Sequence, residues 1–330
     1  LIGNINAGGG GVGRNLVVNG AMSVAQRGTS FANPSNGAKT LDQFRNASSH
    51  DGAITITQDG SGPDGFANSL KVDVTTADTS VGAAQYQHIW TRIEAQNLQH
   101  LKFGTSDAQN VTLSFYVKSN KTGTYAVVLA QNDNSFKQAT LTYTINSANT
   151  WERKSLTFNG DTSGVINDDS GSGLEINFIL TAGTNYTSGS ASASFATYAA
   201  TNYAVGHAVN ILDSTSNEWL LTGVQLEVGQ NETTFEHRPY VQHLLDCQRY
   251  AFVIDATDDN EGSGERAFGL GTYYNDTSVI IYIDTPVEMR ATPSLSVDLN
   301  GSSQWLQSYV GATGNSSNAG LNVGQNGNNT

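Results

Sequence analysis

The stretch Val111-Thr-Leu-Ser-Phe-Tyr-Val117 alternates apolar and polar side chains without interruption. In an extended chain its apolar side chains fall on one face and the side chains between them on the other. This period of two is typical of a β-strand with one face against a hydrophobic core. Outward along the chain the alternation recurs at Ile54/Ile56, Leu70/Val72/Val74, Val127/Leu129, Leu141/Tyr143/Ile145, Leu156/Phe158, Leu174/Ile176/Phe178/Leu180 and Leu220/Thr222/Val224/Leu226/Val228.

Turn-forming pairs such as Asp59-Gly60 and Asn159-Gly160 separate these runs. About ten short strands at such spacings predict an all-β fold, an antiparallel β-sandwich. A further strand is expected at residues 16–18. Helix is expected only at 94–101 and at 239–247, where Pro239 stands at the first helical position.

The composition excludes several classes of protein. The 330 residues include 16 Lys and Arg against 29 Asp and Glu, and no cluster of basic residues occurs, so neither a nucleic acid nor an anionic membrane is an expected partner. No apolar run is long enough for membrane insertion. Cys247 is alone, which excludes a disulfide within the chain. Only 14% of the residues are charged, so we expect a surface of neutral hydrogen-bonding groups.

The alternation restarts after the second predicted helix as a separate set of short strands, expected at 249–254, 267–274, 279–284 and 295–299. This restart suggests a division of the chain near residue 239. We therefore expect a Gly-rich linker at 1–13, a jelly-roll β-sandwich at 14–238, a smaller β-rich C-terminal domain at 239–310, and a Gly/Asn/Ser-rich tail at 311–330.

Two patterns suggest a cofactor or a metal but lack the required context. Gly8, Gly10 and Gly13 fit the dinucleotide fingerprint G-x-G-x-x-G, yet a strand rather than a helix is expected to follow them. The acidic loops at 167–171 and 258–262 carry the oxygen ligands that calcium prefers, without the EF-hand spacing. We expect no cofactor and no metal, with these acids in solvated turns.

No motif for catalysis is present, and we expect no enzyme. The six histidines are His50, His88, His100, His207, His237 and His243, and none belongs to H-E-x-x-H or accompanies G-x-S-x-G. A hydrolytic site of the Ser/His/Asp or paired-carboxylate type stays open as an alternative, because such sites assemble across loops.

Four stretches together resemble a module of tail-fibre and receptor-binding proteins of tailed bacteriophages. They are Asn15-Leu-Val-Val-Asn-Gly-Ala-Met22 with Ala25-Gln-Arg-Gly28, Leu41-Asp-Gln-Phe-Arg45, Gly223-Val-Gln-Leu-Glu-Val-Gly229 with 234–240 and 247–250, and Pro286-Val-Glu-Met-Arg-Ala-Thr-Pro293. The first domain also resembles the galactose-binding-like jelly roll of many carbohydrate-binding modules. Those modules open with Asn-Leu-x-x-Asn-Gly and close with a strand ending in Leu-Glu.

The resemblance implies a non-enzymatic fibre protein in the virion that attaches the phage to a bacterial surface polysaccharide. It implies a homotrimer with other phage tail proteins as partners. Two alternatives remain: a structural or decoration protein of the virion, and a glycan depolymerase, although the repeats typical of many depolymerases are missing. The modules often hold a structural calcium with acids at two positions where this chain has Ser23 and Gly223.

Four aromatic residues in polar surroundings of the C-terminal domain are the candidate carbohydrate-binding residues: Tyr273, Tyr274, Trp305 and Tyr309. The same rings could instead pack at the trimer interface. The next candidates are the jelly-roll loops at 132–136 and 185–203. We assign to the core the strand aromatics Phe115, Trp151, Phe158 and Phe178.

The family pattern also places Arg27 near the start and Glu227 near the end of the first domain. If the opening and closing strands lie side by side, the two side chains could form a partly buried ion pair. The alternative is an exposed pair of little energetic value.

Overall fold

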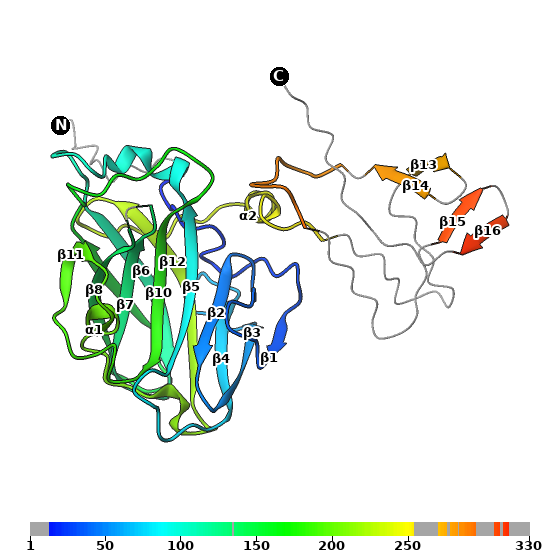
Figure 1. Cartoon of the computed structure of the whole chain (residues 1–330). Helices are drawn as coiled ribbons and strands as arrows, with labels where there is room; N and C mark the ends of the chain where they lie inside the picture. The colour runs from blue at the N-terminus through cyan, green and yellow to red at the C-terminus, as the bar shows by residue number, and fades with distance from the viewer. Residues whose placement is uncertain are drawn as a thin grey trace. The chain divides into compact units, whose positions relative to one another are not determined.

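The computed structural model describes residues 13–133, 135–253, 270–275, 278–282, 284–294, 307–310 and 313–316, and it describes no side chains within 270–282 and 307–316. The chain divides into two compact units, Leu1–Cys247 and Gln248–Thr330. Figure 1 shows the order of the elements along the chain.

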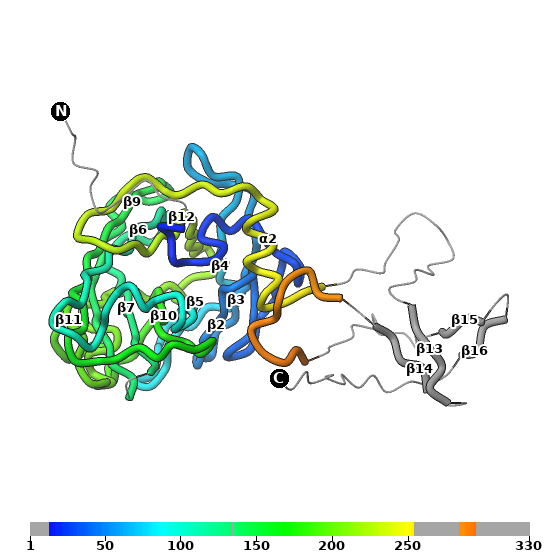
Figure 2. The backbone as a smooth tube through the Cα atoms, turned by 90° about the horizontal axis from the view of Figure 1, so that it is seen from above, coloured from blue at the N-terminus to red at the C-terminus, as the bar shows by residue number. Residues whose placement is uncertain are grey.

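The first unit is a jelly-roll sandwich of two antiparallel six-stranded sheets, which Figure 2 shows as two layers. Sheet 1 contains, in spatial order, β1 (Ser30–Ala32), β3 (Ala53–Asp59), β4 (Ser69–Thr76), β12 (Glu218–Val228), β6 (Val111–Ser119) and β9 (Glu152–Phe158). Sheet 2 contains β11 (Ser192–Thr197), β8 (Lys137–Ile145), β7 (Gly123–Gln131), β10 (Ser172–Ala182), β5 (Tyr86–Glu94) and β2 (Phe44–Ser49). The predicted all-β class is confirmed.

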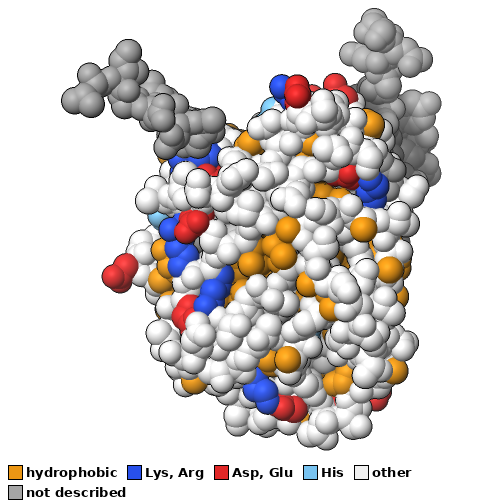
Figure 3. Space-filling view, turned by 90° about the vertical axis from the view of Figure 1, so that its left-hand side faces the viewer, with side chains coloured by type: hydrophobic (Ala, Val, Ile, Leu, Met, Phe, Trp, Pro, Cys, Tyr) orange, Lys and Arg blue, Asp and Glu red, His pale blue; other side chains and the backbone are white. Residues whose placement is uncertain are grey.

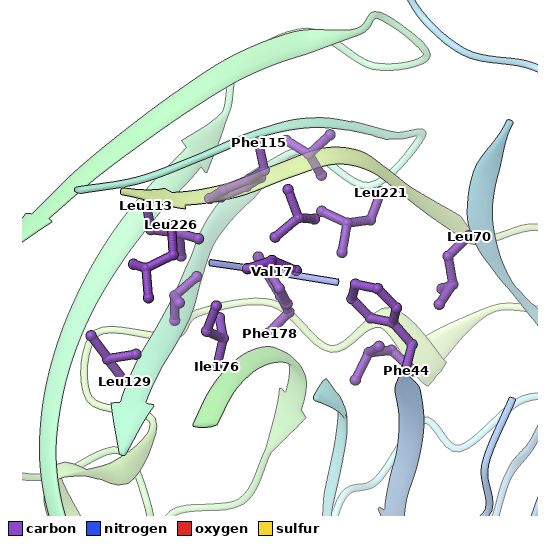
Figure 4. Close-up of a cluster of buried hydrophobic side chains, with 14 of the residues drawn as sticks. Val17, Phe44, Leu70, Leu113, Phe115, Leu129, Ile176, Phe178, Leu221 and Leu226 are labelled. Atoms are coloured by element: carbon purple, nitrogen blue, oxygen red, sulfur yellow. The ribbon is translucent and has the colours of Figure 1, made fainter. Parts of the chain in front are cut away.

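The core lies between the two sheets and contains the side chains that the alternation predicts. Figure 4 shows residues of both sheets meeting there, among them Phe115 of sheet 1 and Phe178 of sheet 2, whose ring centroids lie 5.1 Å apart. Phe158 is also fully buried. Trp151 is an exception to the prediction. It precedes β9 and is only half-buried, with the Lys118 ammonium 5.3 Å from its ring centroid, so it belongs to the surface.

The alternation expected along β12 is wrong in its first half, because a β-bulge reverses it. The pairing of β12 with β6 shifts register between Thr222 and Gln225, and Gly223 there has a φ of +62°. Core contacts come from Trp219 and Leu221 before the bulge and from Val224 and Leu226 after it. The extra residue of a bulge moves the following side chains to the opposite face, so Leu220 and Val224 do not share a face.

The expected strand at residues 16–18 does not form, although this segment lies beside β12. The Leu16 amide donates to the Leu226 carbonyl at 2.9 Å, and the Val224 amide donates to the Gly20 carbonyl at 2.9 Å. Asn19, at a φ of +59°, then turns the chain away from β12. Two backbone hydrogen bonds are too few for a ladder, so the segment docks as an irregular edge.

Both expected helices are present at the expected places in the chain. Residues Ala95–Leu101 form a 3-10 helix, η1, and Tyr240–Gln248 form α2. Two further helical turns are α1 (Ala200–Tyr203) and η2 (Ile211–Asp213). No helix in the described part of the chain is long and apolar enough to span a bilayer.

The second unit contains two short hairpins. Strands β13 (Leu270–Asn275) and β14 (Ser278–Tyr282) pair with each other, as do β15 (Gln307–Val310) and β16 (Thr313–Ser316). The expected strands at 267–274 and 279–284 overlap the first hairpin. The described part of 249–254 is not a strand, and 295–299 lie outside the described residues.

Gly20→Ala should destabilise the protein strongly. A Cβ at Gly20 would lie 2.0 Å from the Val224 carbonyl oxygen, so the opening segment would have to move away from β12. Overpacking of this kind typically costs about 1–3 kcal/mol, which denaturant unfolding measures. Gly60→Ala is the matched control, because a Cβ there meets nothing within 4 Å. Equal unfolding midpoints for the two variants would contradict the docking.

Candidate functional site

The outer face of sheet 2 carries a row of large side chains on β5. Ile89, Thr91 and Ile93 of this strand face the core, so the residues that alternate with them face outward. The outward residues are Tyr86, His88, Trp90 and Arg92. The outer face of β5 therefore carries rings and a guanidinium at every second position.

A groove of about 520 Å³ lies on this face, within the range of small-molecule sites. It is lined by Tyr86, His88, Ser135, Phe136, Ile179, Ala182, Tyr186, Tyr198, Tyr203 and Ala204. None of these described residues is charged. The groove therefore combines aromatic walls with small apolar floor residues.

The rings of the groove form one continuous line. Their centroid separations are 5.9 Å for Tyr186–Tyr86, 5.4 Å for Tyr86–His88, 5.9 Å for His88–Tyr203, 6.1 Å for Tyr203–Tyr198 and 5.3 Å for Tyr198–Phe136. Each separation lies within the range of direct ring contacts. The line is therefore a single surface rather than scattered rings.

The segment that follows β10 folds back over sheet 2 and supplies three of these rings. Ala204, at the end of α1, packs against Ala126, Val128 and Ile179 of the sheet. Its amide donates to the Tyr186 carbonyl at 2.8 Å. This small apolar contact holds the segment close to the sheet.

The opposite end of the groove lies at the tip between β7 and β8. Ser135 and Phe136 have φ angles of +52° and +53°, a conformation that is unfavourable for residues other than glycine. Such strain collects at functional sites. The Phe136 carbonyl accepts a 3.1 Å hydrogen bond from the Tyr198 amide, which joins this tip to the covering segment.

Several phenol hydroxyls of the groove are available to a ligand. The Tyr186 hydroxyl donates to the Ala84 carbonyl at 3.2 Å. Within the described part of the chain, no recorded hydrogen bond uses the hydroxyls of Tyr86, Tyr198 or Tyr203. Burial and neighbouring phenols raise the pKa of Tyr198, and burial with the nearby Glu175 charge raises the pKa of Tyr203 well above 10. Both phenols are therefore neutral donors at physiological pH.

The charged groups on the same face are paired with each other. The Arg92 Nε lies 2.7 Å from a Glu175 carboxylate oxygen. The guanidinium groups of Arg92 and Arg45 lie 4.4 and 4.9 Å from the centroid of the Trp90 ring. Trp90 is buried by them, so it supports the site without lining it. Figure 3, which views an adjoining side, also shows few charged side chains among neutral polar ones.

Two buried histidines carry no charge at physiological pH. Burial lowers the pKa of His88 to about 3 and that of His207 to about 4. The His207 Nδ1 accepts the Ala126 amide at 3.3 Å, which requires the neutral ring. His88 has an Nδ1 without a partner among the described residues. The groove therefore presents a neutral imidazole.

The predicted carbohydrate-binding residues are not among those whose side chains the structure describes. Trp305 lies outside the described residues, and Tyr273, Tyr274 and Tyr309 lie in strands whose side chains are not described. Their roles stay predictions. The alternative loops at 132–136 and 185–203 do supply lining residues, namely Ser135, Phe136, Tyr186, Tyr198 and Tyr203.

Tyr86 and His88 were missed by the sequence reasoning. Their signal was present in Tyr86-Gln-His-Ile-Trp90, where ring-bearing side chains alternate with Gln87 and the core residue Ile89. The alternation predicts a strand with rings on its solvent face. It does not reveal that a segment about a hundred residues further along the chain completes the groove.

The structure gives Arg27 and Glu227 different partners from the expected pair. The Arg27 guanidinium lies 3.7 Å from Asp42, and Glu227 lies 3.5 Å from Arg14 and accepts the Thr233 amide at 2.9 Å. The turn at Asn19 is the reason. It carries Arg27 away from β12, whereas Arg14 precedes the turn and stays beside that strand.

The acidic loop at 167–171 is closed by its own hydrogen bonds. Asp169 accepts the Gly171 amide at 2.7 Å, and Asp133 accepts the Asn167 amide at 3.1 Å. Among the residues that the structure describes, no group of three or more His, Cys, Asp or Glu could hold a metal ion. The loop at 258–262 lies outside the described residues.

No protein-family model matches the chain, and no curated protein sequence matches it. Solved structures with similarity include a tailspike enzymatically active domain of bacteriophage CBA120, at 13% identity and a TM-score of 0.36, covering 66% of this chain and 22% of that one. A putative sugar-binding protein from Bacteroides thetaiotaomicron has 13% identity and a TM-score of 0.37, covering 65% of this chain and 100% of that one.

A family 11 carbohydrate-binding module of a cellulase from Clostridium thermocellum also shows similarity. It has 11% identity and a TM-score of 0.33, covering 61% of this chain and 97% of that one. All three similarities have low TM-scores and identities. We base no functional argument on them.

The stability of the protein should fall as the pH falls from about 6.5 to 5. In this window the unfolded chain protonates His88, whose ordinary pKa is 6.5, while the folded chain does not. Each such histidine makes the free energy of unfolding fall by about 1.4 kcal/mol for each pH unit of acidification. Denaturant unfolding across the window measures it. His88→Gln should reduce the slope by that amount, and the same substitution at exposed His100 is the control. An unchanged slope in His88→Gln would contradict the assignment.

Proposed function

We propose that the groove on sheet 2 binds a neutral carbohydrate and does not cleave it. The observation that carries the proposal is the uninterrupted line of rings from Tyr186 to Phe136 in a groove without charged lining. Aromatic faces pack against the apolar faces of sugar rings, and phenol hydroxyls pair with sugar hydroxyls.

The neutrality of the lining supports an uncharged glycan. An acidic sugar would have to place its carboxylate among phenols and a neutral imidazole, without a cation to offset its desolvation. Arg92, a cation on this face, is already paired with Glu175. A neutral oligosaccharide pays no such electrostatic penalty.

Tyr86→Ala and Tyr198→Ala should each weaken binding of a neutral hexasaccharide by about tenfold or more, because each removes a ring that links two others in the line. The measurement is titration calorimetry with cellohexaose, xylohexaose, maltohexaose and hexagalacturonate. Tyr240→Ala is the matched control, since Tyr240 is 56% exposed on α2 and does not line the groove.

Two results would contradict the proposal. One is preferred binding of hexagalacturonate over the three neutral sugars. The other is wild-type affinity in both groove variants. New reducing ends after incubation with a polysaccharide would instead favour the depolymerase alternative.

The sequence resemblance supports a finer proposal about biological setting. According to this finer proposal, the chain is a tail-fibre protein of the virion that attaches a phage to a bacterial surface polysaccharide. Tyr273, Tyr274, Trp305 and Tyr309 then provide either a second receptor contact or a trimer interface. The second candidate is a structural virion protein that binds other phage tail proteins. Binding of the isolated chain to susceptible cells separates the two.

The finer proposal includes a homotrimer. Light scattering at micromolar concentration should give three times the chain mass of 34.9 kDa. The second unit's described strands form only two-stranded hairpins, which are marginal alone and gain stability by packing against other copies. A mass of one chain would contradict the trimer and leave the groove proposal intact.

A further inference from the structure

Four polar side chains on the outer face of sheet 2 are buried without adequate partners. They are His88, Gln138, Thr140 and Asn177, each at least nine-tenths buried. Among the described residues, His88 Nδ1, Gln138 Oε1, Thr140 Oγ1 and both polar atoms of Asn177 have no hydrogen-bond partner. Native proteins leave few buried polar groups unpaired, and an unpaired carboxamide at 0% exposure is costly.

The strand register places these side chains on the same outer face, with Val128 between Asn177 and Thr140. Asn177 lies opposite Trp90 on one side and opposite Val128 on the other, and Val128 lies opposite Thr140. Asn177 is two residues from Ile179, which lines the groove. The polar row therefore continues the floor of the groove beneath the covering segment.

Tyr203 covers the centre of this row. Its ring lies 5.9 Å from His88, and its phenol experiences the charges of Glu175 and Arg92. Glu175 and Arg92 face each other two residues beyond Asn177 and Trp90 along the strands. Tyr203 therefore extends across the position of Asn177. Its helix, α1, also contacts β8, the strand that carries Thr140.

We propose that the polar row is a covered part of the carbohydrate site, and that a neutral saccharide displaces the Tyr203 ring and pairs its hydroxyls with Asn177 and Thr140. This rests on the proposed function of the groove. A carboxamide and a hydroxyl each donate and accept, as adjacent sugar hydroxyls do. The polar row thus gains in the complex the partners that it lacks in the free protein.

Thr140→Val and Asn177→Leu test the proposal. Both variants should unfold at or above the wild-type temperature, since each removes an unpaired buried group. Both should nevertheless bind the tightest-binding neutral hexasaccharide of the panel about tenfold more weakly. Increased stability combined with weaker binding is the expected signature of a binding floor.

Thr91→Val is the matched control. Thr91 is also a buried threonine with an unpaired hydroxyl, but it faces the core, opposite Phe44 and Ile176. This variant should show the same effect on stability with unchanged affinity.

Other outcomes overturn the proposal. If Thr140→Val and Asn177→Leu bind like Thr91→Val, while Tyr86→Ala and Tyr198→Ala bind weakly, the covered floor is wrong and the groove function stands. If the wild type binds none of the neutral hexasaccharides, both the floor and the groove function are wrong.

Discussion

The side chain of Asn15 is the contact on which the closure of the sandwich depends. Its Nδ2 donates to the Val224 carbonyl at 3.0 Å, and its Oδ1 accepts the Leu226 amide at 3.2 Å. Strand β4 pairs with β12 only as far as Leu221, so beyond the bulge this edge of β12 has no strand beside it. Buried backbone groups need hydrogen-bond partners. One carboxamide supplies them for two backbone groups of β12, where a neighbouring strand would otherwise do so.

This closure leaves the two outer faces of the sandwich unequal. After β12 the chain crosses the outer face of sheet 1, where Phe235 packs 5.0 Å from Phe66 and the Glu236 amide donates to Gln225. That face is therefore covered by a segment tied to the same strand. On sheet 2, the covering segment rests through Ala204 on Ala126, Val128 and Ile179 and leaves rings exposed at its margin, Tyr198 at 43%. Sheet 2 is consequently the face with room for a ligand.

The sequence predicted the features that follow from local periodicity, such as which strand residues face the core. It did not predict the features that follow from one register shift or one turn. The alternation at Val111–Val117 placed Phe115 in the core correctly, because side-chain direction in a strand has only two choices. The bulge at Gly223 reversed that choice for Leu220, and the turn at Asn19 separated Arg27 from Glu227. Only part of the groove could be predicted from the sequence, because Phe136 and Tyr198 are far apart in the chain and meet through the pairing of β8 with β11.

Several unfavourable features of this protein lie on the outer face of sheet 2, and their position bears on the proposed function. The φ angles of Ser135 and Phe136 and the unpaired carboxamide of Asn177 all reduce stability, while the core beneath them is continuous. A core of this size tolerates such local costs, so stability alone would not preserve them. Local rules that fail on the solvent face of an otherwise consistent sheet are what the proposed binding surface would require. Under that proposal, the neutral character of the surface favours ligands that offer hydroxyls and apolar faces rather than charge.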